Sequence, residues 1–351
     1  MTAVLPAPVA LATPAATTTR PRSKGGESDF GPLVAVVKEH DLLRRRRGKY
    51  VVSVLGDSLL LVATVVILVA AAGSWWALCA ALPLALWSAR IGFLGHDAGH
   101  RQVARRPEIN RRMGLLLANV LSGMSQGWWD RKHNRHHANP NDVEKDPDVS
   151  TGVIAWTPEQ AGDDRGPVLK WLAAHQGYAF VPLLTLEGFN LKVASIMDVV
   201  KRLAWFEISL MVLHYVLYFG LLSLVLSPLQ VIAFFVVHQA IFGLHLGLAF
   251  APNHKGMPMP QPGEHWTHLQ RQVLTSRNVR AHPVTDWLMG GLNYQVEHHL
   301  FPSIPRHSMG ALKPFVMQHC ATQGLPYTET SAPRSYAIAL AYLHEVGTEL
   351  R

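Results

Sequence analysis

The sequence predicts an all-α integral membrane protein, in which four transmembrane helices form two hairpins and a cytoplasmic helical domain binds metal through histidine. Three observations predict this fold class. Hydrophobic residues are 49% of the 351 residues, and charged residues are only 16%. Two long stretches are almost free of charge, and the chain has 19 histidines but only 2 cysteines. This composition excludes general disorder, because so much apolar surface must be buried, and two cysteines exclude a four-thiolate iron–sulfur cluster.

The first 50 residues are expected to precede the membrane-spanning part of the chain. Residues 1–27 are rich in Ala, Pro and Thr and lack the basic start of a secretory signal, so we expect a disordered tail. Residues 28–50 form a basic cytoplasmic segment that includes Arg44 to Arg47. The net charge of +8 favours anionic partners such as lipid headgroups. Nucleic-acid binding is not expected, because arginines beside a span are explained by membrane topology.

The first hairpin is predicted at residues 51–95. Between Ser58 and Leu94 the only charged side chain is Arg90. One helix of that length would measure about 55 Å at 1.5 Å per residue, against a bilayer core of roughly 30 Å. A turn near Gly73-Ser74 is therefore required, and we place the two spans at about 51–72 and 75–95.

The second hairpin is predicted at residues 205–251. Ile208 to Asn253 contains no Asp, Glu, Lys or Arg, and Ser227-Pro228 is the natural turn. Basic residues flank the spans but are absent from both turns, so the termini and the segments 96–204 and 252–351 are expected in the cytoplasm. Asp57 and Glu207 are then expected near the cytoplasmic ends of spans, solvated by water.

Three histidine clusters follow the spacing of one helix face. They are His96-Asp-Ala-Gly-His100, His133-Asn-Arg-His136-His137 and Gln295-Val-Glu-His298-His299. Side chains at i, i+3 and i+4 share a face, so each cluster can direct several imidazoles at one metal. His254 ends the fourth span on the same predicted side and is an eighth candidate ligand. Eight imidazoles exceed the four ligands of one structural zinc site and suggest two metal ions.

The residues alone leave the metal and its use open. Imidazole binds Zn, Cu, Fe and Ni, and a histidine-rich metal transporter or sensor is one interpretation. A transporter would place ligands within the spans, whereas the three clusters lie outside the predicted spans. The alternative is a redox metal beside a lipid-filled cavity, which can attack unactivated C–H bonds.

At these clusters the sequence resembles the membrane fatty acid desaturases. The boxes HDAGH, HNRHH and QVEHH have that family's order and spacing, and Gln295, which opens the third box, resembles the front-end, Δ6-like branch. The resemblance covers roughly residues 50–310. It implies a di-iron centre with O2 as co-substrate, held by the eight histidines His96, His100, His133, His136, His137, His254, His298 and His299. His282-Pro283 is followed by Val284, so the haem motif of a fused cytochrome b5 domain is missing and no such domain is expected.

The resemblance also implies roles for neighbouring residues and for partners. The substrate would be a fatty acyl chain, linked to coenzyme A or to a lipid, that gains a cis double bond. Electrons would come from an external donor such as a ferredoxin or a flavin–iron–sulfur reductase. A lipid hydroxylase or ketolase on the same scaffold remains an alternative. Candidates to orient the ligands are Gln295, Asp97, Asn134, Glu297 and Asn253, and candidates to line a substrate tunnel are Trp128 and Trp129.

Overall fold

The computed structural model describes residues 28–162, 165–261 and 263–351, so the tail predicted at residues 1–27 lies outside the described residues. The described chain is mainly helical, with almost no strands. Its one sheet pairs two short parallel strands, β1 (Asn278–Val279) and β2 (Glu329–Thr330). The mainly helical fold class predicted from composition is therefore confirmed.

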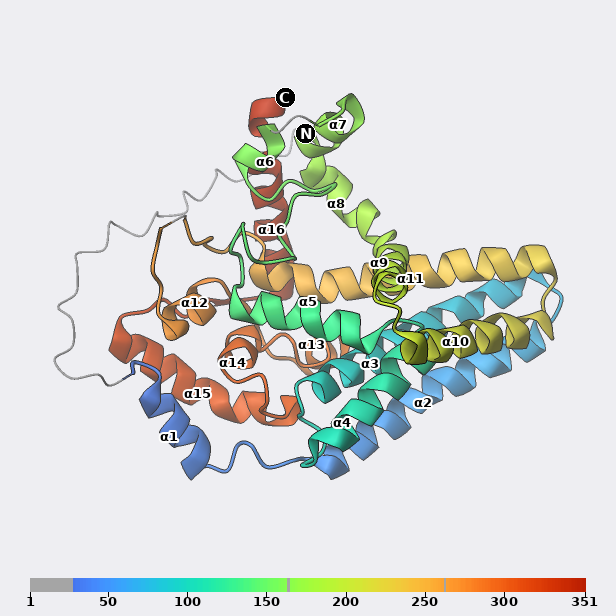
Figure 1. The fold of residues 1–351 in the computed structure, drawn as a ribbon, viewed down its shortest axis with the longest axis horizontal. Helices are drawn as coiled ribbons and strands as arrows, with labels where there is room; N and C mark the ends of the chain where they lie inside the picture. Colours follow the sequence, from blue (N-terminus) through green and yellow to red (C-terminus); the bar gives the residue numbers. More distant parts are fainter. Residues whose placement is uncertain (1–27, 163–164, 262) are drawn as a thin grey trace, which may run out of the picture.

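Four helices are long and apolar enough to cross a membrane. They are α2 (Arg47–Ala70), α3 (Ala81–Gly99) together with the 3₁₀ turn η1 (Trp75–Ala80), α10 (Trp205–Ser223) and α11 (Pro228–His254). In Figure 1 these helices extend together from one end of the molecule. Each lies where the sequence predicts a span, but α3 continues past residue 95 and carries His96 on the same continuous helix.

The turns at the far ends of these helices are held to each other. Gly73 has a left-handed φ of 73°, which favours glycine, and its N–H donates to the Val225 carbonyl at 2.9 Å. The Gln230 amide donates to the Gly73 carbonyl at 3.0 Å, while Ser227 and Gln230 form a capping box at the start of α11. The two predicted turns therefore lie in contact.

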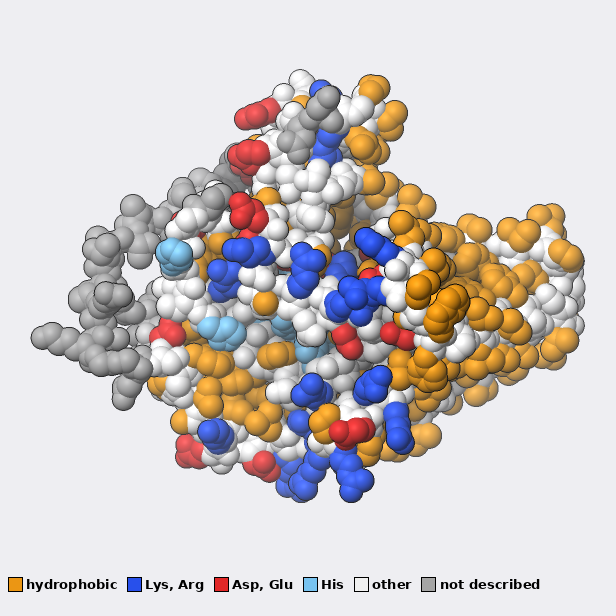
Figure 2. All heavy atoms as spheres, viewed as in Figure 1, with side chains coloured by type: hydrophobic (Ala, Val, Ile, Leu, Met, Phe, Trp, Pro, Cys, Tyr) orange, Lys and Arg blue, Asp and Glu red, His pale blue; other side chains and the backbone are white. Residues whose placement is uncertain are grey.

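The apolar side chains on this part of the molecule face outward. Val52 of α2 is 70% exposed, and Val216 of α10 is 63% exposed. Figure 2 shows hydrophobic side chains covering the end where α2, α10 and α11 lie, whereas Lys and Arg gather beyond it. A contiguous apolar surface of this extent requires an apolar environment, which a bilayer provides.

Two acidic residues differ from the sequence-based expectation of solvated carboxylates. Asp57 is buried and accepts from Arg90 Nε at 2.9 Å and from the Trp287 indole at 3.3 Å. Glu207 accepts from the Ser125 hydroxyl at 2.6 Å, and also from the Asn119 side chain and the Gly127 N–H. The expectation was wrong because these partners come from segments far away in sequence.

The histidine boxes lie on helices at the other end of the long helices. α5 (Gln126–Ala138) carries the second box, and the short α14 (Gln295–Leu300) carries the third. The polar part of the fold also contains α1 (Gly31–Glu39), α4 (Pro107–Gly114), the π-helix η2 (Leu115–Leu121), α12 (His268–Leu274), α13 (Pro283–Leu288) and α15 (Arg306–Gln323).

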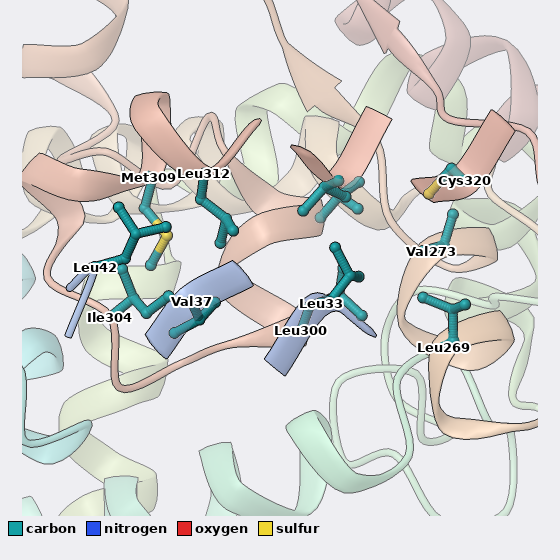
Figure 3. Close-up of a cluster of buried hydrophobic side chains, with 12 residues drawn as sticks. Leu33, Val37, Leu42, Leu269, Val273, Leu300, Ile304, Met309, Leu312 and Cys320 are labelled. Atoms are coloured by element: carbon teal, nitrogen blue, oxygen red, sulfur yellow. The ribbon is translucent and has the colours of Figure 1, made fainter. Parts of the chain in front are cut away.

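A buried hydrophobic cluster fixes the position of α14. Figure 3 shows Leu33 of α1, Val273 of α12, Leu300 of α14 and Leu312 of α15 as members of this cluster. All four side chains are at most 3% exposed. Burying each such side chain contributes about 1.5–3 kcal/mol, so α14 is packed rigidly although it is only six residues long.

Six remaining elements form a group, of which the three longest pack against α11 and the others pack on those three and on one another. They are α6 (Pro158–Gly162), α7 (Pro167–Ala174), α8 (Gln176–Leu184), α9 (Glu187–Lys201), α16 (Ala332–Val346) and the 3₁₀ turn η3 (Thr348–Leu350). The apolar stretch near Tyr178 to Leu186 does not continue as one straight helix, because α8 and α9 bend by 70° between them. By length and composition alone, the two helices together are apolar enough for a bent span or a re-entrant loop.

Candidate metal centre

Eight histidines from separate parts of the chain converge at one place. His96 and His254 lie in the C-terminal turns of α3 and α11, and His100 follows as the C-cap of α3. α5 contributes His133, His136 and His137, and α14 contributes His298 and His299. Ser125 caps α5 by accepting from the Trp128 N–H at 2.9 Å, so the helix begins early enough to place its three histidines on the inner side.

The eight imidazoles form two neighbouring groups. The first contains His96, His100, His133, His137 and His298, and the second contains His136, His254 and His299. In each group one nitrogen per residue lies within 4.8 Å of every other. The groups adjoin, because the rings of His137 and His299 stack with centroids 4.3 Å apart. This arrangement has room for one metal ion in each group.

The ring nitrogens are arranged to receive cations. His133 Nε2 lies 2.9 Å from His100 Nε2 and 3.0 Å from His137 Nε2. In the described chain, the Nε2 atoms of His96, His298 and His299 are buried without any hydrogen-bond partner. Leaving buried polar atoms unpaired costs free energy. A metal ion bound by these lone pairs removes that cost, so the residues fit a pair of metal ions.

Four histidines are oriented through their other nitrogen. His136 Nδ1 donates to Asp146 at 2.9 Å, and His299 Nδ1 donates to Gln272 Oε1 at 3.0 Å. His254 Nδ1 donates to the Thr275 carbonyl at 2.9 Å, and His96 Nδ1 lies 3.4 Å from Asp97. Each contact favours the tautomer with the proton on Nδ1, in which the lone pair that can bind a metal is on Nε2.

The protonation state also suits metal binding. Burial, followed by the positive charge that neighbouring imidazoles would carry, lowers the pKa values of His133, His137, His298 and His299 well below the usual value. Desolvation disfavours the charged ring. These histidines are therefore neutral at pH 7, which is the form that coordinates metal.

Gln295 lies directly beside the three-histidine group. Its buried Nε2 is 2.9 Å from His254 Nε2, and its Oε1 accepts from Asn253 Nδ2 at 3.1 Å. Asn253 is held in turn by the carbonyls of Ala249 and Leu292. The structure thus brings together Gln295 and Asn253, two of the five candidates for orienting residues, next to His254.

The other orienting candidates are placed differently. Asp97 lies between His96 and the guanidinium of Arg306. Asn134 is exposed and points away from the histidines, because it is one residue past His133 on α5. Glu297 is buried but accepts from Asn278 Nδ2 at 2.7 Å and from Tyr327 Oη at 2.7 Å, so it anchors α14 rather than a histidine.

Of the two tunnel candidates, only Trp129 contacts the histidines. Its ring stacks on His133 with centroids 4.3 Å apart and meets His96 edge-on at 5.4 Å. A Cβ at Gly99 would lie 2.5 Å from Trp129 Cζ3, so only glycine permits this approach. Trp128 is half-buried and lies outside these ring contacts.

Several contacts of the site have no individual signal in the sequence. Asp146, Gln272, Thr275 and Arg306 reach the histidines from loops and helices outside the boxes. Asp146 and Gln272 match residues shared with the resembling family, which is the one sequence feature that could have indicated them. Arg306 stands at the start of α15 and has no such feature.

Most of this chain is similar to a known protein family. Residues 73–331, about three quarters of the chain, match the family described as fatty acid desaturase. The chain belongs to the fatty acid desaturase family. The resemblance stated from the boxes is thereby confirmed.

Curated relatives of this desaturase-family chain include enzymes with different regiochemistry. The acyl-lipid (9-3)-desaturase of Physcomitrium patens is 28% identical over 331 residues, which are 91% of this chain and 62% of the relative. The Delta(6)-fatty-acid desaturase fat-3 of Caenorhabditis elegans is 30% identical over 79% of this chain and 66% of the relative. The Delta(8)-fatty-acid desaturase of Helianthus annuus is 25% identical over 86% and 69%. The chain thus spans about two thirds of the length of these relatives.

Proposed function

We propose that this chain is an O2-dependent desaturase that introduces a cis double bond into a fatty acyl chain, esterified to coenzyme A or to a lipid. The observation that carries the proposal is the pair of adjoining histidine groups at the ends of α3 and α11. When bound there, two iron ions supply the redox chemistry with O2 that no side chain can perform on an unactivated C–H bond.

The protein's own task is to position the substrate and the ligands. Trp129 is held against His133 and His96 by the close approach at Gly99, and it forms a rigid apolar wall beside the metal-binding nitrogens. A methylene pair fixed against such a wall avoids the entropy cost of finding the reactive geometry. Burial of each methylene along the chain's path adds about 0.8 kcal/mol of binding free energy.

The proposed membrane placement follows from the same helices. In this proposal α2, η1–α3, α10 and α11 cross the bilayer as two hairpins. The basic residues that flank these helices support a cytoplasmic location for both termini and the metal centre. Two electrons per double bond then come from a cytoplasmic donor such as a ferredoxin or a flavin–iron–sulfur reductase.

Mass spectrometry of the lipids of a host that expresses the protein tests this function. We expect acyl chains that have lost two hydrogens, and we expect no such product from the His298→Ala variant. Chains that instead gain one oxygen would identify a hydroxylase or ketolase on the same scaffold. Unchanged lipids together with metal flux into vesicles would identify a transporter and overturn the proposal.

A further inference from the structure

A second polar cluster lies inside the helix bundle, apart from the metal centre. It surrounds a partly open cavity of about 50 Å³ between η2, α3, α9, α10 and α11. A single water needs roughly 10–15 Å³, so the cavity holds a few waters or one small polar group. The polar residues lining it are Ser88, Ser122, Lys192, His214, Tyr218, His238 and Gln239.

The cavity contains a buried lysine without a counterion. Lys192 is 6% exposed, and its Nζ donates to the Ser122 carbonyl at 2.5 Å. Its other near neighbours are the rings of Tyr215 and Phe242, each with its centroid 5.9 Å away. Among the described residues no carboxylate forms an ion pair with Lys192, and Glu207 on the adjoining α10 is occupied by Ser125, Asn119 and Gly127. A buried ammonium without an anion is costly.

Further polar atoms in the cavity also lack partners. Ser122 Oγ and Gln239 Oε1 are buried and unpartnered within the described chain. His238, in contrast, is occupied: its Nε2 lies 3.1 Å from Ser88 Oγ and its Nδ1 lies 2.9 Å from Tyr218 Oη. The groups available to a ligand are therefore the remaining N–H donors of Lys192, the Ser122 hydroxyl and the Gln239 amide oxygen.

We propose that this cavity binds the carboxyl group of a free fatty acid from the bilayer. A carboxyl group accepts hydrogen bonds from Lys192 and Ser122 and supplies the missing counterion. When it carries a proton, it also donates to the Gln239 oxygen. The apolar cavity residues Leu84, Trp87, Leu121 and Phe242 suit the first methylenes of the chain. An esterified acyl substrate has no free carboxyl group, so this ligand differs from the substrate of the proposed desaturase.

Equilibrium binding of radiolabelled hexadecanoic acid to the purified full-length protein tests the proposal. The assay contains no reductant, and it includes the His298→Ala variant, so its outcome does not depend on desaturase activity. We expect Lys192→Met to weaken binding by about tenfold or more, because the ion pair is lost, and Ser122→Ala to weaken it to a smaller extent. Lys201→Met is the matched control, since Lys201 is exposed at the end of the same helix.

The competitor distinguishes the carboxyl group from the chain. We expect unlabelled hexadecanoic acid to displace the label, and we expect methyl hexadecanoate, which has the same chain without the acid, to displace it at least tenfold less well, by the ion-pair argument. Equal competition by the ester would overturn the proposal. A Lys192→Met variant that is folded, as its melting temperature shows, and that binds hexadecanoic acid with wild-type affinity would overturn it as well. If Lys192→Met does not fold, wild-type affinity in Ser122→Ala would overturn the proposal.

Discussion

At the residue scale, the candidate metal centre depends on contacts that fix each ring. Asp146 illustrates this, because its carboxylate accepts from His136 Nδ1 and also from the backbone N–H groups of Asn141 and Asp148. The carboxylate is itself rigid, so it transfers that rigidity to the imidazole. Histidine ligands without such a partner lose both the preferred tautomer and the ring orientation.

Replacing Asp146 tests this orienting role. Asp146→Asn keeps the size of the side chain but removes its charge, and we expect about 10–100-fold weaker iron binding, as is typical for such partners. Iron retained against a chelator series gives the affinity. Asp198→Asn is the matched control, since Asp198 pairs with Arg131 and Arg202 at the surface. Equal iron affinity in both variants would contradict the role.

The lowered histidine pKa values predict a pH dependence. His133, His137, His298 and His299 have pKa values below those of unfolded histidine, so the unfolded chain takes up protons first when the pH falls below about 6.5. The stability that these neutral histidines give the folded chain is therefore present above that pH and is lost as the pH falls below it. We expect the melting temperature of the metal-free protein to fall between about pH 7.5 and about pH 5. The melting temperature of the double variant His137→Gln/His298→Gln should fall less steeply over the same pH range. An identical slope would show that these histidines do not cause the pH dependence.

The site was predictable from sequence where helix periodicity reveals it. His96 with His100, and His133 with His136 and His137, are spaced for one helix face, and the structure brings all of them together. Arg306 and Thr275 could not be predicted, because each reaches the site through tertiary packing. Glu297 shows the converse: it lies beside ligands in sequence but faces the opposite side of α14.

At the element scale, α9 and α11 cross with almost no space between their backbones. A Cβ at Gly243 would lie 2.3 Å from the Gly188 nitrogen, and a Cβ at Gly188 would lie 2.4 Å from the Gln239 carbonyl oxygen. Small residues permit such close helix contacts in membrane proteins. The crossing fixes α11, whose last residue is His254.

Enlarging Gly243 tests this crossing. Gly243→Val forces the two backbones apart, and we expect a loss of about 3 kcal/mol of stability, at the upper end of typical overpacking, because backbone atoms cannot turn aside. Gly220→Val on α10 is the control, since a Cβ there meets nothing within 4 Å. Thermal melting in one detergent compares them. A Gly243→Val melting temperature equal to that of Gly220→Val would disprove the tight crossing.

The long helices were predictable because a helix of a soluble protein seldom runs for such a length without a charged or polar face. The ends of these helices were less predictable. α3 continues to Gly99 because His96 and Asp97 are buried against other elements and do not end the helix. The ion pair of Asp57 with Arg90 was not predicted. Trp287 contacts both side chains but lies far away in the chain, so the sequence does not show that the three residues meet.

At the scale of the whole molecule, the apolar end and the histidine-bearing end are separate (Figure 2). The proposed topology places the turn between α2 and η1 outside the cell and α5 in the cytoplasm. Both regions offer exposed positions, Ala72 in the turn and Asn134 on α5. Of the two native cysteines, Cys79 is exposed and Cys320 is buried.

Thiol labelling tests the topology. In a Cys79→Ala background, Ala72→Cys should react with a membrane-impermeant maleimide on intact spheroplasts, and Asn134→Cys should react only in inverted vesicles. The background protein without an added cysteine is the control for Cys320. Labelling of both positions from the same side would rule out the two-hairpin arrangement.

The central claim is that the eight histidines hold two iron ions used in catalysis. Elemental analysis of a purified preparation whose desaturase activity is measured in parallel tests it most directly. We predict about two iron ions per chain, with activity proportional to iron content, and loss of both in His137→Ala, which removes one member of the five-histidine group. A fully active preparation without stoichiometric iron would contradict the account.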